Sequence, residues 1–223
     1  MKEYPITYGL ITINIVIYLL PLLIGVIHIN SEYLLSVGAI YGPAVVLQGE
    51  IWRLLTAIFL HGGLEHIGMN MLSLWFVGRV VEMWFDKLSY LSIYLISGII
   101  GGLVSIYIHP ITVGIGASGA IFGIFGAMAG VVTVHRKRME AQFKAFINQF
   151  GIILLLNLII GVAFESVDLS AHIAGLIVGI IGGALIGKNR KNIWLYIIIM
   201  GIFMVFLYNY LPSLYVTTKF AIN

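Results

Sequence analysis

The fold is decided by residues 116–134, which read GASGAIFGIFGAMAGVVTV. This stretch holds no charged side chain and is close to the ~20 apolar residues that an α-helix needs to cross a bilayer. Its small residues recur along one side of the predicted helix, at Gly119, Gly123, Ala127 and Gly130. Small residues let the backbones of two membrane helices approach closely. The stretch therefore predicts a spanning helix that packs tightly against a neighbour.

The composition of the whole chain indicates that lipid is its solvent. Of its 223 residues 61% are hydrophobic and 9% charged, whereas a soluble domain carries about 25% charged residues. There is no cysteine, so neither a disulfide framework nor a thiolate metal site is available. The basic residues stand in short clusters between apolar runs, which favours membrane topology over nucleic-acid binding. We expect neither a cleaved signal nor a transit peptide, because the first apolar run is long enough to span.

Seven apolar runs predict an all-α polytopic membrane protein. They are Ile6–Ile27, Ile67–Val81, Tyr90–Ile108, Ala117–Val134, Ala145–Phe164, Ala171–Gly187 and Ile193–Leu211. Between the first two lies a long loop, Asn30–Leu60, in which Tyr41 and Trp52 suit the headgroup zone. We expect this loop to be partly embedded. We divide the chain into a core at 1–187, with six spans, and an additional C-terminal helix and tail at 188–223.

The Lys and Arg residues predict the orientation, because cytoplasmic loops carry an excess of them. With a cytoplasmic N-terminus, ten of the 12 fall inside. These are Lys2, Arg79, Lys87, Arg136, Lys137, Arg138, Lys144, Lys188, Arg190 and Lys191. Arg53 and Lys219 fall outside. We therefore expect a multi-pass protein of a cell membrane, of prokaryotic type, whose loops Pro110–Gly116 and Glu165–Ser170 lie outside.

Ser118 lies where an outer loop enters the helix first described, in Gly116-Ala117-Ser118-Gly119. A helix N-terminus offers free N–H groups and a positive dipole potential, which suit a developing oxyanion. The flanking glycines let the backbone approach a ligand closely, so we expect Gly116 at the oxyanion and substrate site. The competing interpretation is that these small residues only allow tight packing.

His172 stands at the start of the run Ala171–Gly187, again on the outer side. An ionisable group that enters a span is costly and indicates function, although an interfacial histidine that caps a helix is the alternative. The run has a small face of its own, formed by Gly175, Gly179 and Gly183. Packing the two small faces together would bring Ser118 near His172, and a serine needs an adjacent base to be nucleophilic.

The segment 61–70 reads HGGLEHIGMN and supplies a third candidate. His66 and Asn70 are four apart, so they share a helix face, and both can donate hydrogen bonds to an oxyanion. Zinc is the competing interpretation, but His61 and His66 are five apart and no H-E-x-x-H motif is present. We expect His61 to brace the loop by hydrogen bonds. We interpret Asp168 as a solvated loop residue or helix N-cap rather than the acid of a triad.

Together these residues resemble the rhomboid family of intramembrane proteases, over about Ile6–Gly187. The match runs in order through Glu50-Ile51-Trp52-Arg53, His61 with His66 and Asn70, Gly116-Ala117-Ser118-Gly119, and Ala171-His172-Ile173-Ala174-Gly175. Each piece is weak alone, but their order and shared side make the combination specific. The resemblance implies a rhomboid-like six-helix core in which Ser118 and His172 form a dyad without a catalytic acid.

The resemblance also implies roles for the supporting residues. The backbone N–H of Ser118 would bind the oxyanion together with His66 and Asn70. Trp52 and Arg53 would be structural residues of the first loop. Family members often have a tyrosine four residues after the serine, where its ring stacks on the catalytic histidine.

Two features depart from the family pattern or extend beyond it. Phe122 keeps the aromatic ring at that position and loses the hydroxyl, and we expect activity to survive. The run Ile193–Leu211 lies beyond the shared core, and its role stays open.

The sequence therefore predicts an intramembrane serine endopeptidase that cuts transmembrane segments of membrane proteins near the outer face. The resemblance implies substrates with a helix-weakening segment there and a small residue before the cut. We expect the lipid bilayer as surroundings, and no cofactor, metal ion or nucleic acid.

Two other functions compete with this prediction. A catalytically inactive relative that binds membrane proteins would lack the serine or the histidine. A transporter would place polar groups or broken helices near the midplane, often in two related halves.

Overall fold

The computed structural model describes residues 4–26, 28–137, 167–217 and the single positions 141, 144, 148 and 151. In chain order its helices are α1 (Pro5–Leu23), α2 (Ser31–Ser36), α3 (Gly42–Val46), α4 (Arg53–Thr56), η1 (Ala57–Phe59), α5 (Leu64–Ser73), η2 (Leu74–Gly78), α6 (Arg79–Glu82), α7 (Lys87–Ile108), α8 (Ser118–Val134), α11 (Leu169–Lys188), η4 (Arg190–Asn192), α12 (Ile193–Tyr210) and α13 (Pro212–Thr217). The described residues form no strand, only an isolated bridge between Ile40 and Gly114. The prediction of an all-α polytopic membrane fold is confirmed.

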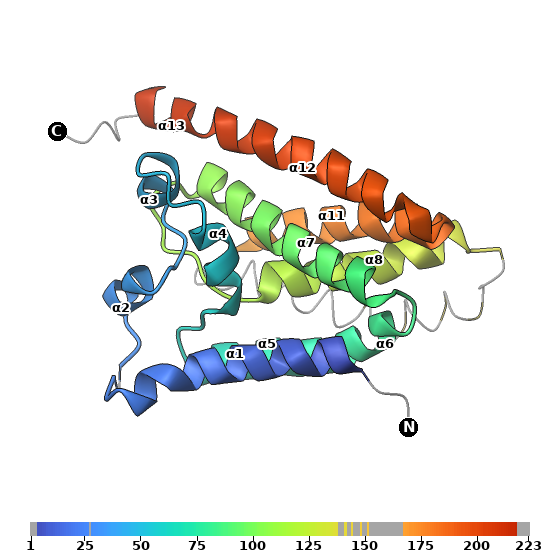
Figure 1. Cartoon of the computed structure of the whole chain (residues 1–223), viewed down its shortest axis with the longest axis horizontal. Coiled ribbons are helices and arrows are strands. Elements are labelled where there is room, and N and C mark those ends of the chain that lie inside the picture. Colours follow the sequence, from blue (N-terminus) through green and yellow to red (C-terminus); the bar gives the residue numbers. More distant parts are fainter. Residues whose placement is uncertain are drawn as a thin grey trace.

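The long helices lie roughly side by side (Figure 1). Helices α7, α8 and α11 form the centre, α12 runs along one side, and α1 with α5 runs along the other. The short helices α2, α3 and α4, which belong to the long first loop, gather at the end of the bundle where α8 begins. We call this the Ser118 end. Helix α8, whose first residue is Ser118, thus begins at the end of the bundle where these short helices lie.

Most of the predicted spans correspond to helices. The helices long and apolar enough to cross a membrane are Pro5–Leu23, Lys87–Ile108, Leu169–Lys188 and Arg190–Tyr215. Helix α8 is apolar and shorter, at 17 residues. The run Ala145–Phe164 falls outside the described residues apart from positions 148 and 151. The total of seven spans and the division at residue 187 therefore stay predictions.

The run Ile67–Val81 is helical throughout but is not a uniform α-helix. Helix α5 passes into five π-helical residues, Leu74–Gly78, and then into α6. A π-helical turn holds an additional residue and is frequent at functional sites. The hydrophobic pattern of the run contains no sign of it.

A carboxylate ties α1 to the end of this second helical run. Glu82 accepts hydrogen bonds from the backbone N–H groups of Ile6 and Thr7, at 2.8 and 2.9 Å, and from the Thr7 hydroxyl at 2.7 Å. The Thr7 hydroxyl also lies 3.2 Å from the Tyr90 hydroxyl of α7. Helix N-termini leave N–H groups without intrahelical partners, so Glu82 satisfies groups that would otherwise be exposed to lipid.

Helices α8 and α11 approach each other through their glycines, as their sequence pattern predicts. A Cβ added at Gly175 would lie 2.1 Å from the Gly119 carbonyl oxygen, and one added at Gly179 would lie 1.9 Å from that of Gly123. A Cβ at Gly183 would lie 2.0 Å from the Ala127 carbonyl oxygen. Backbone therefore packs on backbone at three successive turns of the two helices.

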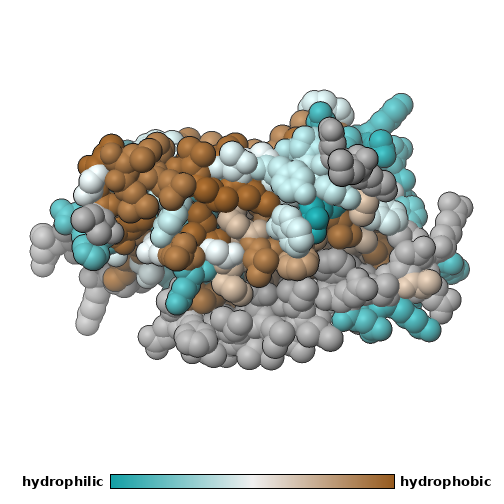
Figure 2. All heavy atoms as spheres, turned by 90° about the horizontal axis from the view of Figure 1, so that it is seen from below, coloured by the Kyte–Doolittle hydropathy of each residue, from teal (hydrophilic) through white to brown (hydrophobic). Residues whose placement is uncertain are grey.

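Apolar side chains cover much of the outer surface of the bundle. In Figure 2 they gather across the body of the α1 and α5 face, and hydrophilic residues gather toward its ends. The exposed large hydrophobic residues on these two helices are Tyr8, Ile13, Ile15, Val16, Leu19, Leu20, Leu22, Leu23, Leu64, Met69 and Leu72. Exposed apolar surface of this extent is expected where lipid replaces water.

We predict that Gly179→Ala lowers the free energy of unfolding by about 2 kcal/mol or more, because overpacking a tight interface typically costs about 1–3 kcal/mol. Gly201→Ala in α12 is the matched control, since a Cβ there meets nothing within 4 Å. Both changes raise helix propensity alike. Unfolding in detergent measures the difference. Equal stability of the two variants would contradict the close contact of α8 with α11.

Candidate active site

Ser118 is the first residue of α8, and Gly116, two residues before it, has an unusual backbone conformation. Gly116 has φ of 112°, a backbone region that residues with a Cβ rarely adopt. Its N–H donates a hydrogen bond of 2.8 Å to the carbonyl oxygen of Ala57. Ala117 then caps the helix without a side-chain hydrogen bond. The first N–H groups of α8 therefore face the space in front of the helix.

His66 and Asn70 lie against this turn. A Cβ added at Gly116 would lie 2.7 Å from His66 Nε2 and 3.7 Å from Asn70 Nδ2. Asn70 is buried and His66 half-buried. The side chains that the sequence places on one face of α5 thus converge on the backbone just before Ser118. A larger residue than glycine would fill the space between them.

His172 lies in the first turn of α11 and stacks on Phe122 of α8. The two ring centroids are 4.3 Å apart with 11° between their planes. His172 is only 5% exposed. The contact between the two helices lies beside it, where a Cβ at Gly119 would lie 3.4 Å from the Ala171 carbonyl oxygen. The backbone at Gly119 and Ala171, which are the chain neighbours of Ser118 and His172, is thus one of the points at which α8 and α11 meet.

Asp168 is the N-cap of α11. Its carboxylate accepts a hydrogen bond of 3.0 Å from the Ala171 N–H and one of 2.5 Å from the Ser170 hydroxyl. Burial by itself would raise the pKa of this carboxyl, but hydrogen bonds from Ser105, Ser170 and Ala171 outweigh it, so the pKa lies below its usual value. Within the described part of the chain, the buried Nδ1 of His172 has no hydrogen-bond partner. The N-cap interpretation is confirmed, and no carboxylate orients His172 in the described residues.

His61 packs edge-on against His66, with ring centroids 5.0 Å apart. Only 2% of His61 is exposed. Burial, together with the neighbouring His66, lowers the pKa of His61 to about 4 against a smaller opposing effect of the Phe59 carbonyl. Neither ring nitrogen of His61 has a hydrogen-bond partner in the part of the chain that the structure describes. The expectation that His61 braces the loop by hydrogen bonds is therefore wrong, and its buried ring packs against His66 instead.

Arg53 organises the long first loop. Its guanidinium pairs with Glu50 at 2.5 Å and donates hydrogen bonds to the carbonyl oxygens of Leu35 and Ala39, at 2.6 and 3.1 Å. It also lies 4.7 Å from the centroid of the Trp52 ring. These contacts hold the chain between α2 and α4. They are consistent with the structural roles that the family resemblance implies for Trp52 and Arg53.

One residue of the site has no signal in the sequence. Ala57 accepts the Gly116 N–H through its backbone carbonyl, and a backbone acceptor leaves no mark on residue type. Ala57 is buried in η1. It links the turn before Ser118 to the first loop.

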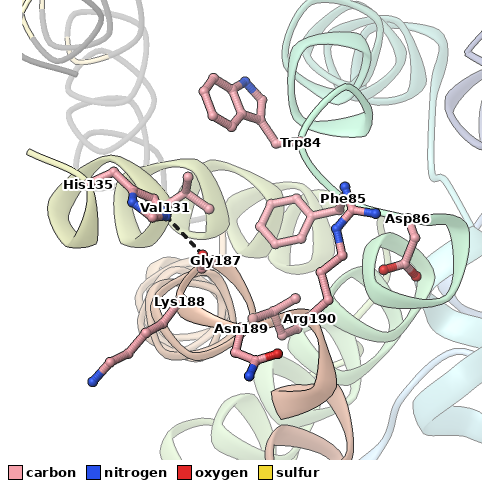
Figure 3. A pocket seen from close by; sticks show the side chains of 10 residues that line it. Trp84, Phe85, Asp86, Val131, His135, Gly187, Lys188, Asn189 and Arg190 are labelled. Carbon is pink, nitrogen blue, oxygen red and sulfur yellow. Dashed lines mark hydrogen bonds between the residues drawn. The ribbon is translucent and has the colours of Figure 1, made fainter. Parts of the chain in front are cut away.

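A cavity of about 310 Å³ lies at the opposite end of α8 and α11, away from these residues. Figure 3 shows its walls, with His135 of α8 hydrogen-bonded through Nε2 to the Gly187 carbonyl oxygen at 2.9 Å. Trp84, Asp86 and Arg190 also line it. The cavity is separate from the candidate site, which lies at the Ser118 end.

The sequence is similar to that of known proteins. The family model described as Rhomboid domain matches residues 48–189. Rhomboid protease GluP of Bacillus subtilis is 38% identical over 190 residues, which are 83% of this chain and 36% of that protein. RHOMBOID-like protein 1 of Arabidopsis thaliana is 36% identical over 69% of this chain and 39% of its own length. Rhomboid-like protease 3 of Toxoplasma gondii is 32% identical, over 74% and 61% respectively. The chain thus spans between about a third and three fifths of these relatives.

The cap of α11 yields a prediction on stability. Asp168→Ala should lower the free energy of unfolding by about 1 kcal/mol, the usual contribution of an N-cap. Asp168→Asn keeps an acceptor and should stay close to the wild type. Because folding lowers the carboxyl pKa, the charged cap stabilises above about pH 4 and loses this effect as the pH falls further. Unfolding in detergent measures all three proteins, and an alanine variant as stable as the wild type would contradict the cap.

Proposed function

This chain belongs to the rhomboid family, and on that premise we propose that it is an intramembrane serine endopeptidase with Ser118 as nucleophile and His172 as general base. The observation that carries the proposal is the stack of His172 on Phe122 where the first turns of α8 and α11 pack together. It supports a buried imidazole held in one orientation beside the helix that begins with Ser118. The rhomboid protease among its relatives makes peptide-bond hydrolysis the reaction to test first.

The reaction we propose has two halves. The Ser118 oxygen attacks the carbonyl carbon of the scissile peptide bond while His172 takes the hydroxyl proton. His172 then gives this proton to the leaving amine, the C–N bond breaks, and an acyl-enzyme forms. Water attacks the acyl carbon with His172 again as base, which releases the carboxylate and restores Ser118. A serine is a weak nucleophile without such a base.

The oxyanion would be bound at the start of α8. The Ser118 N–H is one of the free N–H groups of a helix N-terminus and benefits from the positive end of the dipole. The side chains of His66 and Asn70, close to Gly116, can donate two further hydrogen bonds. Donors of this kind act on charge that develops only in the transition state. Asp168 has no catalytic part in this proposal.

The substrates we propose are transmembrane proteins. A peptide bond inside a helix is hydrogen-bonded within that helix, so the substrate must unwind before it can reach Ser118. Unwound backbone is tolerated in a membrane only in a water-accessible or protein-lined space. We propose that the N-terminus is cytoplasmic, on the distribution of Lys and Arg, and that cleavage occurs near the outer face.

The dyad can be tested by substitution and by labelling. Ser118→Ala should abolish cleavage of a transmembrane substrate and leave a folded protein, because little volume changes. His172→Ala should reduce cleavage nearly as far, and a fluorophosphonate should label Ser118 far less in this variant than in the wild type. Ser36→Ala, at the exposed end of α2, and His28→Ala, at an exposed loop position, serve as matched controls and should label normally.

Two results would overturn the dyad. Undiminished turnover of Ser118→Ala would exclude it as nucleophile. A folded wild type that neither cleaves nor labels would favour a catalytically inactive relative that binds membrane proteins.

The oxyanion donors should matter less than the dyad. His66→Ala or Asn70→Ala should each lower turnover by ~10²–10³, the usual loss for one donor, with little effect on substrate binding. Because both face the same group, the losses should not add in the double variant. Thermal stability is measured alongside. Wild-type turnover in both single variants would refute the role, and losses that only follow the folded fraction would leave the pair as structural residues.

A further inference from the structure

The C-terminal helices contact the loops that lead to the Ser118 end. Figure 1 shows α13 beside α3, far from the start of α12. The Tyr208 hydroxyl of α12 donates a hydrogen bond of 3.3 Å to the Val45 carbonyl oxygen in α3. The Tyr215 hydroxyl of α13 donates one of 2.9 Å to the Pro110 carbonyl oxygen, in the loop between α7 and α8. Two hydroxyls thus hold backbone on two separate loops.

Gly42 of the first loop lies directly against the contact of Tyr215 with Pro110. A Cβ added at Gly42 would lie 1.9 Å from the Tyr215 hydroxyl and 2.1 Å from the Pro110 carbonyl oxygen. Only glycine at position 42 therefore lets Tyr215 reach Pro110. The Tyr215 side chain is itself 6% exposed, so the hydrogen bond is shielded from lipid and water.

Leu211, between these tyrosines in the sequence, is buried against the first loop and α7. It is 1% exposed and packs in one apolar cluster with residues of the first loop and of α7. The buried members of this cluster are Ile40, Val45, Leu54, Ala57, Leu103, Ile106 and Leu211. Ala57 is the residue whose carbonyl holds the Gly116 N–H. The C-terminal helices therefore share a core with the backbone that positions the turn before Ser118.

From Pro110 the hydrogen bonds continue toward the site. Gly114 and Ile40 exchange two backbone hydrogen bonds, each of 2.9 Å. Gly116 follows with its bond to Ala57, and Ser118 begins α8 two residues later. The loop between α7 and α8 is thus hydrogen-bonded at Pro110, at Gly114 and at Gly116. Tyr215 makes the hydrogen bond on the α7 side.

We infer that α12 and α13 form a brace for the active-site loop and that Tyr215 is a positioning residue for turnover. The inference rests on the proposed function for its catalytic meaning. Tyr215 does not touch the reacting atoms. It acts through Pro110 and Gly114 on Gly116, the residue that lies between His66 and Asn70. This gives a part in catalysis to the helix that lies beyond the matched Rhomboid domain.

The variant that tests the brace is Tyr215→Phe in the full chain, because it removes one hydroxyl and keeps the ring. Tyr210→Phe is the matched control, on the last turn of α12 with an exposed ring that stacks only loosely on Tyr107, at 5.9 Å. We expect Tyr215→Phe to lower kcat about tenfold with KM unchanged, because small displacements of reacting groups cost up to ~10²-fold in rate. Hydrogen exchange at the Gly114 and Gly116 amides should become roughly tenfold faster, as for the loss of about one hydrogen bond.

The two measurements separate the brace from the proposed chemistry. Faster exchange and lower kcat in Tyr215→Phe alone, with an unchanged unfolding midpoint, would support the inference. Unchanged exchange at both amides would overturn it, whatever the activity. Faster exchange with wild-type kcat would also overturn it. A wild type without cleavage or fluorophosphonate labelling would refute the proposed function and, with it, the role of Tyr215 in turnover, while exchange would still report whether Tyr215 holds the loop.

Discussion

The contact of α8 with α11 is the constraint on which the other features depend. Lipid gives no hydrophobic force that would drive two apolar helices together, so van der Waals packing has to do it. Glycines at 119 and 123 on one helix and at 175 and 179 on the other let carbonyl oxygens lie where side chains would be. The same contact brings the first turns of both helices together. The position of the candidate site is therefore set by the glycines that let these two helices approach.

The remaining parts of the site are arranged around that contact by loops. Phe122 holds the His172 ring from the side of α8, and Asp168 fixes the first turn of α11 by capping it. Arg53 donates hydrogen bonds to two carbonyl groups of the first loop, those of Leu35 and Ala39. Arg53 and Asp168 thus bind backbone groups, whereas the buried ring nitrogens of His61 and Nδ1 of His172 have no hydrogen-bond partner among the described residues.

Much of this architecture could be predicted from sequence. The helical runs follow from apolar length, and the small faces follow from the spacing of glycines, because both signals are local. The shared face of His66 and Asn70 follows from helical periodicity. The convergence of that face on Gly116 was implied only by the family resemblance and not by helical periodicity, since it depends on backbone contacts between distant segments such as Ala57 and Gly116. The contacts of the tyrosines of α12 and α13 could not be predicted either. Each hydroxyl donates to a backbone carbonyl, and every residue type has one.

The π-helical residues 74–78 divide the second helical run into two parts that make different contacts. The part before them carries His66 and Asn70, and the part after them carries Glu82, which caps α1. Each residue turns an α-helix by about 100°, so the additional residue sets the rotation of one part against the other. Deletion of a single residue there would keep the run helical but swing the two polar side chains away from Gly116, or else pull Glu82 off α1. The number of residues in this run thus fixes the direction in which its first part faces relative to its second. The run is therefore intolerant of insertions and deletions that an ordinary lipid-facing helix would tolerate.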